Sequence, residues 1–241
     1  MVPYRPMFEI TLAGPGKNAL GTQTMTALLA KLAEANGAPV LLSGSGGAFS
    51  AGLDLKEVAS LDAPGMLTFL ALLERTMTAL YLYPAPTVAA VNGHAIAGGC
   101  IVALCCDRRV ASAEAKIKIG VNEVALGVEF PPRTFEIVKR RVPAQHIEEV
   151  VLGAGLFDPA NALRLGLVDE IAEDAVSVAR TRLAAFAAHP PSAYAAAKRA
   201  LRGGMPSDLV PESEQARLLA AAAPAWTSPA VKERLAKVLA R

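Results

Sequence analysis

Two turns built from small residues constrain this chain most strongly. They are Ala48-Phe49-Ser50-Ala51-Gly52-Leu53-Asp54-Leu55 and Gly93-His94-Ala95-Ile96-Ala97-Gly98-Gly99-Cys100. Each follows an apolar run typical of a buried strand and leads toward a helical segment. Small residues leave backbone N–H groups uncovered, and a helix that starts at such a turn directs its positive end at a ligand. Two such turns side by side would place two N–H donors on one oxygen, as an oxyanion hole does.

One carboxylate, Glu123, follows 25 residues after Gly98. Its neighbours Ile119, Val121 and Val124 are apolar, so this segment of the sequence favours burial. Burial raises the pKa of a carboxyl group toward neutrality, where the group can both take and return a proton. One acid combined with two turns whose backbone N–H groups are uncovered indicates a reaction that passes through an enolate.

Length and composition exclude several classes of protein. With 241 residues the chain is long enough for one large domain or two small ones, and no linker rich in Pro, Gly or Ser divides it. The 24 Lys and Arg residues nearly balance the 22 Asp and Glu residues, so we expect no nucleic-acid partner. Apolar residues make up 53% of the chain, but no apolar run reaches the roughly 20 residues of a membrane-spanning helix. We therefore expect no membrane partner.

The cysteines and the N-terminus indicate a reducing compartment. Cys100, Cys105 and Cys106 lie in one apolar stretch, an odd set that makes a poor disulfide framework and lacks the spacing of a zinc site. We expect them to be buried thiols and expect no metal. Residues 1–6, Met-Val-Pro-Tyr-Arg-Pro, have no apolar signal core, which predicts a cytoplasmic protein.

Hydrophobic periodicity predicts an α/β fold. The expected strands cover residues 7–13, 39–42, 87–92, 109–111 and 116–119, and the expected helices cover residues 22–36, 65–83 and 98–106. From residue 132 onward the pattern is almost entirely helical. Since the strand, turn and helix recur in that order, successive turns should emerge at one edge, where such folds bind ligands.

Four segments in this order resemble the enoyl-CoA hydratase/isomerase (crotonase) superfamily over nearly the whole chain. They are Lys17-Asn18-Ala19-Leu20, the two turns, and a later segment from Ala162-Leu163 to Gly166-Leu167-Val168-Asp169. The resemblance implies a crotonase-like spiral of strand-strand-helix units in residues 1–190. A helical C-terminal region in residues 191–241 would build a homotrimer or a dimer of trimers.

The resemblance also implies roles for single residues. Ala51 and Gly98 would donate their N–H groups to a thioester oxygen, and Glu123 would exchange protons with the acyl chain of an acyl-CoA substrate. No cofactor is implied beyond the coenzyme A carried by the substrate. The substrate-binding residues would be Ala51, Gly52, Leu53, Asp54, Leu55, Lys56 and Gly98. From the residues alone, Asp54 is equally suited to cap a helix, and Lys56 or Lys17 to bind phosphate or to be an ordinary surface lysine.

One position separates two reactions of this family. Its hydratases carry a second glutamate just after the cysteine of the second turn, where this chain has Ile101. An isoleucine cannot hold a water molecule, whereas a single acid suffices to move a double bond. The segments around Gly98 and Glu123 look closer to the mitochondrial-type Δ3,Δ2-enoyl-CoA isomerases, so we expect an enoyl-CoA isomerase.

The sequence also allows other functions and other roles for single residues. Glu129 could supply a second acid for a hydratase, lyase or hydrolase, or it could be a helix-entry carboxylate. The chain could also bind CoA esters without turning them over. The small residues around His94 favour its backbone, rather than its imidazole ring, as the functional element. The side chains of Lys232, Arg234 and Lys237 could reach a neighbouring subunit's ligand or could simply be solvated.

Overall fold

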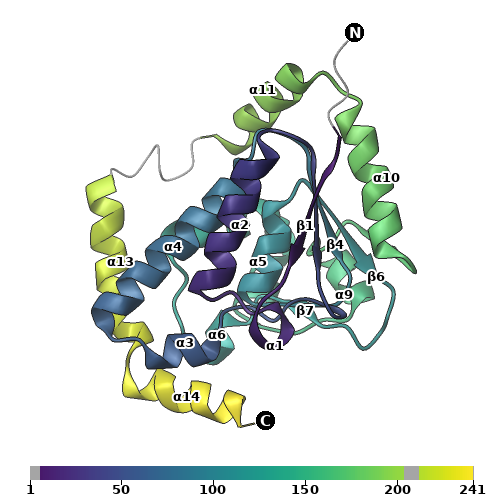
Figure 1. The fold of residues 1–241 in the computed structure, drawn as a ribbon. Coiled ribbons are helices and arrows are strands. Elements are labelled where there is room, and N and C mark those ends of the chain that lie inside the picture. Colours follow the sequence, from purple (N-terminus) through teal and green to yellow (C-terminus); the bar gives the residue numbers. More distant parts are fainter. Residues whose placement is uncertain (1–5, 204–211, 241) are drawn as a thin grey trace.

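The computed structural model describes residues 6–203 and 212–240, which form two parallel sheets surrounded by helices (Figure 1). The larger sheet has the strand order β1-β2-β4-β6-β8, and all its neighbouring strands are parallel. Its strands are Phe8–Leu12, Val40–Gly44, Thr87–Val91, Arg108–Ser112 and Glu170–Ala172. The smaller sheet has the order β3-β5-β7, with strands Ala48–Ser50, His94–Ile96 and Ile119–Gly120.

A strand-strand-helix unit repeats three times along the chain. In each unit a strand of the large sheet is followed by a strand of the small sheet and then by a helix, giving β2-β3-α3, β4-β5-α5 and β6-β7-α6. Each unit therefore adds one strand to both sheets, and the chain winds as a spiral. This arrangement confirms the predicted crotonase-like α/β fold.

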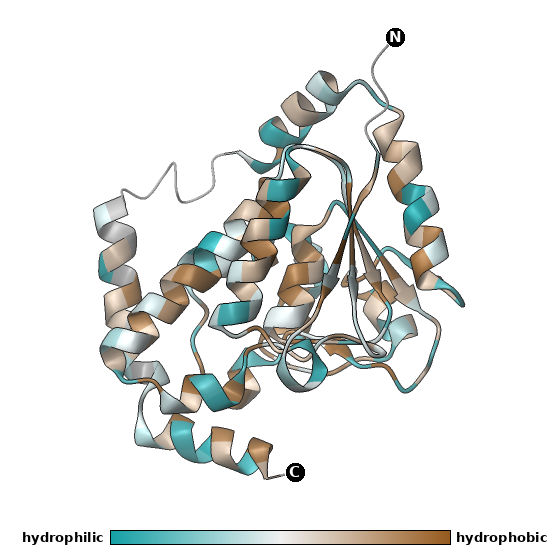
Figure 2. Ribbon diagram, viewed as in Figure 1, coloured by the Kyte–Doolittle hydropathy of each residue, from teal (hydrophilic) through white to brown (hydrophobic). Residues whose placement is uncertain are grey.

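The large sheet is apolar on both faces because helices cover both. All five residues of β4 are buried. Along this strand Val88 and Ala90 pack into a smaller core under α10, while Ala89 and Val91 face the main core under α2, α4 and α5. Figure 2 shows the same strands coloured mainly as apolar.

The helices follow the order of the spiral, and their bounds within the described residues are as follows. The first group comprises α1 Pro15–Asn18, α2 Thr22–Ala35, α3 Leu55–Ser60, α4 Ala63–Tyr81, α5 Gly98–Cys105, α6 Glu123–Leu126 and α7 Pro132–Arg141. The second group comprises the 3-10 turn Ala144–His146, α8 Ile147–Val151, α9 Pro159–Arg164, α10 Ala175–Ala187, α11 Pro191–Arg202, α13 Glu212–Trp226 and α14 Pro229–Leu239. Near the C-terminus, α13 packs against α4 and α14 packs against α3 (Figure 1).

A buried ionic cluster ties α11 to the core. The carboxylate of Asp107, just before β6, accepts hydrogen bonds from Lys198 Nζ (2.9 Å) and Tyr194 Oη (2.9 Å), and Arg202 Nη2 lies 2.8 Å from its other oxygen. The Thr87 N–H also donates to it at 2.7 Å. Burial lowers the pKa of Lys198 to about 8 although Asp107 opposes this shift. Every charge in this cluster therefore has a nearby partner.

Two elements differ from the sequence-based prediction. The predicted strand at residues 116–119 is shorter, because the Ile117 N–H closes a turn onto the Glu114 carbonyl oxygen (3.0 Å) and pairing begins only at Ile119. The described region beyond residue 132 is almost entirely helical, as predicted, but the three-residue strand β8, which pairs with β6 at the edge of the sheet, was not predicted. Residues 1–6 were predicted to lack a signal segment, and residues 1–5 lie outside the described part. None of the helices in the described ranges is long and apolar enough to cross a membrane.

Candidate active site

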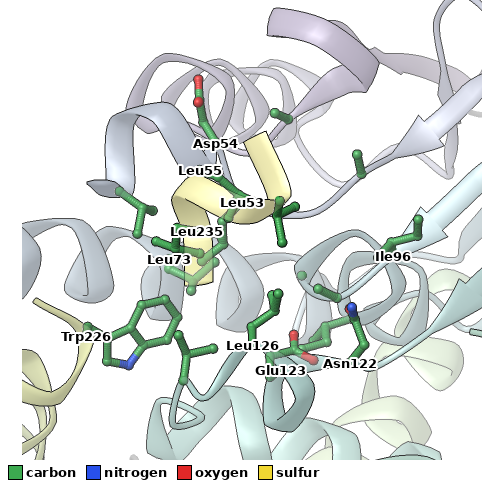
Figure 3. Close-up of a pocket in the computed structure, with 18 of the residues that line it drawn as sticks. Leu53, Asp54, Leu55, Leu73, Ile96, Asn122, Glu123, Leu126, Trp226 and Leu235 are labelled. Carbon is green, nitrogen blue, oxygen red and sulfur yellow. The ribbon is translucent and has the colours of Figure 1, made fainter. Parts of the chain in front are cut away.

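A cavity of about 470 Å³ lies where the two glycine-bearing turns meet α4, α6, the start of α7 and the two C-terminal helices (Figure 3). Its wall is mainly apolar, with Leu73 from α4, Trp226 from α13 and Leu235 from α14. Glu123 and Asn122 enter it from the start of α6 (Figure 3). The structure thus brings together both predicted turns and the predicted acid.

The first turn presents a different amide from the one predicted. The Ala51 N–H already donates to the Lys17 carbonyl oxygen at 2.9 Å, so the expectation that this group is free is wrong. Leu53 forms a parallel bridge with Leu20, in which the flanking Gly52 O and Asp54 N are the bonded groups. The Leu53 N–H therefore points to the other side of this strand, and no described residue accepts it. Leu53 lines the cavity, so its amide is the candidate donor.

Asn18 holds this turn in place. Its backbone is left-handed, with φ 57°, and its Nδ2 donates to the carbonyl oxygens of Ser45 (2.9 Å) and Ala48 (2.8 Å). The Ser50 hydroxyl donates back to the Asn18 carbonyl oxygen at 2.8 Å. These buried hydrogen bonds fix the backbone that leads to Leu53.

The second turn packs directly against the first. A Cβ on Gly99 would lie 2.3 Å from the Ser50 carbonyl oxygen, so only glycine permits this approach. A Cβ on Gly52 would lie 3.4 Å from the Gly98 backbone nitrogen. Gly98 begins α5, where helical geometry provides no acceptor for its N–H. The amides of Leu53 and Gly98 are therefore neighbours at the cavity, as an oxyanion hole requires.

Glu123 is a buried acid with no counterion in the part of the chain that the structure describes. It is 7% exposed, and its Oε2 has no hydrogen-bond partner among the described residues. Burial in this apolar wall raises the pKa of Glu123 to about 8. A carboxyl group with a pKa near neutrality suits proton transfer in both directions.

Ile101 and Glu129 bear on whether a second acid is available. Ile101 is 1% exposed and lines the cavity, so its side chain occupies the position where a hydratase's second glutamate is expected. Glu129 is exposed and is not part of the cavity wall; its carbonyl oxygen accepts a hydrogen bond from Trp226 Nε1 at 3.0 Å. The suggestion that Glu129 supplies a second acid is therefore not supported by its location.

The remaining predicted residues divide between the rim and the scaffold. Asp54 lines the cavity, but its carboxylate caps α3 by accepting the N–H groups of Lys56 and Glu57. Lys17 and Lys56 are exposed at the cavity rim, and Gly52 and Leu55 belong to the first turn. His94 Nδ1 accepts the Lys118 N–H, and its ring does not line the cavity. No group of described residues could hold a metal ion.

The C-terminal helix has a role that the sequence did not indicate. Leu235, Val238 and Leu239 of α14 line this chain's own cavity, and Arg234 lies over Gly127, where a Cβ would come within 2.0 Å of its Nη1. Lys237 pairs with Glu233 at 2.8 Å. Whether Lys232, Arg234 and Lys237 reach a neighbouring subunit's ligand stays a prediction.

Sequence reasoning also missed Asn122, Thr134 and Trp226, which all line the cavity. Asn122 precedes the predicted acid, and this adjacency could have marked it. Thr134 and Trp226 carried no signal, because they enter the wall through packing between elements that are far apart in sequence.

Comparison with known proteins identifies relatives over most of the chain. Residues 4–225 match the family model described as enoyl-CoA hydratase/isomerase. The chain is 33% identical to mouse mitochondrial enoyl-CoA delta isomerase 1 over 177 residues, which is 73% of this chain and 61% of that protein. It therefore spans less than two thirds of that relative's length. It is 32% identical to a probable enoyl-CoA hydratase of Mycobacterium tuberculosis over 209 residues, covering 83% of this chain and 79% of the relative.

Solved structures agree with this relationship. The crystal structure of human mitochondrial delta3-delta2-enoyl-CoA isomerase matches with a TM-score of 0.91 at 26% identity, covering 100% of this chain and 97% of the other. An enoyl-CoA hydratase from Bacillus halodurans matches with a TM-score of 0.82 at 26% identity, covering 96% of each chain. Both an isomerase and a hydratase thus share the fold.

Proposed function

Because the chain belongs to the enoyl-CoA hydratase/isomerase family, we propose that it is an enoyl-CoA isomerase, which moves a double bond from the 3 to the 2 position of an acyl-CoA thioester. The observation that carries this proposal is that the cavity wall offers a single carboxyl group free to transfer a proton. Among the described residues of the cavity wall, the carboxyl groups belong to Glu123 and Asp54, and Asp54 caps α3. Glu123 alone is available for proton transfer.

The proposed mechanism uses one acid twice. The ionised Glu123 removes a proton from C2 of a 3-enoyl-CoA, and the electron pair of that C–H bond delocalises into a dienolate. The N–H groups of Leu53 and Gly98 donate to the thioester oxygen, each stabilising the transition state by about 3 kcal/mol. Protonated Glu123 then gives the proton to C4, and the double bond forms between C2 and C3. This proposal requires no redox or metal step.

Hydration is a second candidate, because a relative at 32% identity is named a probable hydratase. Hydration needs groups that hold a water molecule beside the double bond. Ile101 offers none at the position where a hydratase's second glutamate is expected, and Pro131, which lines this wall just before α7, has no N–H. A binding protein without turnover would have no use for an unpaired buried acid, whose burial is costly. These features favour isomerisation.

The direct test replaces Glu123 with glutamine. We expect Glu123→Gln to lower double-bond migration by roughly 1,000-fold, because the amide keeps the shape but cannot accept the proton. The rate is followed by the absorbance of the conjugated thioester, and affinity for a CoA ester should stay within a few-fold.

Glu129→Gln is the matched control, since it removes an exposed acid six residues away. It should keep nearly full activity. Near-normal turnover in Glu123→Gln, or loss of turnover only in Glu129→Gln, would move the catalytic role away from Glu123.

Substrate binding and assembly follow from the same proposal. Lys17 and Lys56, exposed at the rim, would contact the phosphates of coenzyme A. Assembly into a homotrimer or a dimer of trimers stays a prediction that sedimentation analysis can check, as does a cytoplasmic location.

A further inference from the structure

The single tryptophan of the chain forms part of the cavity wall. Trp226 lies at the end of α13, is 3% exposed and lines the cavity. Figure 3 shows its indole ring beside Leu73 and Leu235, on the side of the cavity away from Ile96 and Asn122. The bulkiest side chain of the wall therefore lies on the side away from the second turn.

A hydrogen bond holds the indole ring in this position. Its Nε1–H donates to the Glu129 carbonyl oxygen at 3.0 Å, and Glu129 is not part of the cavity wall. The polar edge of the ring is thus satisfied outside the cavity, so the ring presents carbon atoms to a ligand. The backbone that carries the ring is held as well, because α13 packs against α4 and α7. Trp226 is therefore a fixed apolar surface.

Burial orders the cavity wall from the rim to this ring. Lys17 and Lys56 are exposed at the rim, where the polar coenzyme A group would stay. Leu73, Met77 and Trp226 line the cavity with exposed fractions of 3%, 1% and 3%. Coenzyme A and the acyl chain leave the thioester in opposite directions. An acyl chain whose coenzyme A stays at the rim would therefore extend toward the buried group.

We propose that Trp226 sets the length of the longest acyl chain that the cavity accepts. This inference rests on the part of the proposed function in which the cavity binds an acyl-CoA thioester. Each methylene group that enters the apolar cavity leaves water and tightens binding by about fourfold. A chain that reaches the ring meets a fixed wall, and a further methylene has no space unless packed side chains move. The substrate class is thus the acyl-CoA thioesters whose chain ends at or before this ring.

Binding of saturated acyl-CoA esters to the full chain tests the inference without turnover. Calorimetry would measure Kd for straight chains of increasing length, and tryptophan fluorescence would be recorded on the same complexes. Because the chain has one tryptophan, this fluorescence reports on Trp226 alone. We expect the affinity to rise with chain length until the chain reaches the ring and then to fall by about tenfold. The fluorescence should change for chains close to this limit and not for free coenzyme A.

Replacing the ring should move the limit. In Trp226→Leu the smaller side chain leaves space where the ring lay, so the first chain that the wild type rejects should bind about tenfold more tightly, relative to a short chain. Trp226→Phe removes less volume and should move the limit by less. The limit is a comparison between ligands in one preparation, so it can be measured even in a variant of lower stability.

Phe69→Leu is the matched control. Phe69 is 2% exposed and belongs to α4, the helix against which α13 packs, but it does not line the cavity. This variant should lose stability and keep the wild-type limit. A limit that stays unchanged in both Trp226 variants, or that moves equally in Phe69→Leu, would overturn the role of Trp226. Fluorescence that is independent of chain length would overturn it as well.

Failure of this inference can be told apart from failure of the proposed function. Acyl-CoA binding with the expected limit, but without isomerisation of any 3-enoyl-CoA, would overturn the proposed reaction and support the role of Trp226. Isomerisation without a limit that depends on Trp226 would overturn the inference alone. Absence of any acyl-CoA binding would overturn both.

Discussion

Two carboxyl groups sit in the interior of this molecule under opposite conditions. Asp107 is surrounded by Lys198, Arg202 and Tyr194, all within hydrogen-bond or ion-pair distance. Glu123 lies in an apolar wall, where one of its oxygens has no partner within residues 6–203 and 212–240, and burial raises its pKa to about 8. The ion pairs of Asp107 hold α11 against the core, whereas the surroundings of Glu123 leave its carboxyl group able to gain or lose a proton near neutral pH. The partners of each group, rather than burial itself, separate the structural acid Asp107 from Glu123, the acid that we propose to be catalytic.

Removing the charge of the partnered acid should have the largest effect on stability. Asp107→Asn leaves Lys198 and Arg202 buried without a counterion, so we expect a loss of about 3–5 kcal/mol in the free energy of unfolding. Urea denaturation measures this loss. Activity per folded molecule should survive, because Asp107 does not line the cavity.

Asp174→Asn provides the control for that experiment. Asp174 caps the exposed start of α10, and asparagine caps equally well, so a change below about 0.5 kcal/mol is expected. If both variants changed stability equally, the Asp107 cluster would not be the structural centre described above.

The surroundings of the solitary acid can be tested at the second turn. Gly98→Pro removes the N–H proposed to bind the thioester oxygen and should lower turnover by roughly 100-fold. Gly98→Ala keeps the N–H, and its Cβ would meet neighbours no closer than 3.4 Å, so it should retain most activity. Circular dichroism checks that both variants fold. Equal activity in the two variants would contradict the oxyanion role of Gly98.

The unpaired acid should also make stability depend on pH. Burial raises the pKa of Glu123 in the folded chain from its ordinary value of 4.5 to about 8, so between these values the folded chain holds a proton that the unfolded chain has lost. Stability contributed by this group is therefore lost as the pH rises toward 8. Glu123→Gln lacks this dependence and should gain on the order of 2 kcal/mol over the wild type between pH 6 and pH 8, roughly 4–8 °C in Tm. If the difference in Tm between Glu123→Gln and the wild type stayed the same at all pH values, the raised pKa would be contradicted.

The sequence predicted the turns and the acid because both depend on local pattern. Apolar runs before Ala48 and Gly93 predicted buried strands, and the apolar neighbours of Glu123 predicted its burial, which the structure bears out. The choice between the Ala51 and Leu53 amides could not be made, because it depends on which side of the segment pairs with Leu20. That pairing is a long-range contact and leaves no local signature.

The same limit applies to the rest of the site. Trp226 and Leu235 reach the cavity only because α13 and α14 fold back over α4 and α3. The edge strand β8 has three residues, too few for an alternating pattern to distinguish it from the end of a helix. Periodicity predicts which face of an element is buried but not which distant element covers it.

The central claim is that one acid and two backbone amides move a double bond without adding water. The most direct test gives the wild-type protein a 3-enoyl-CoA and a 2-enoyl-CoA of equal chain length and compares the rates of isomerisation and hydration in one preparation. Our account predicts that isomerisation is far faster, because Ile101 occupies the place of a water-holding acid. Faster hydration, or no reaction with the 3-enoyl-CoA, would contradict it.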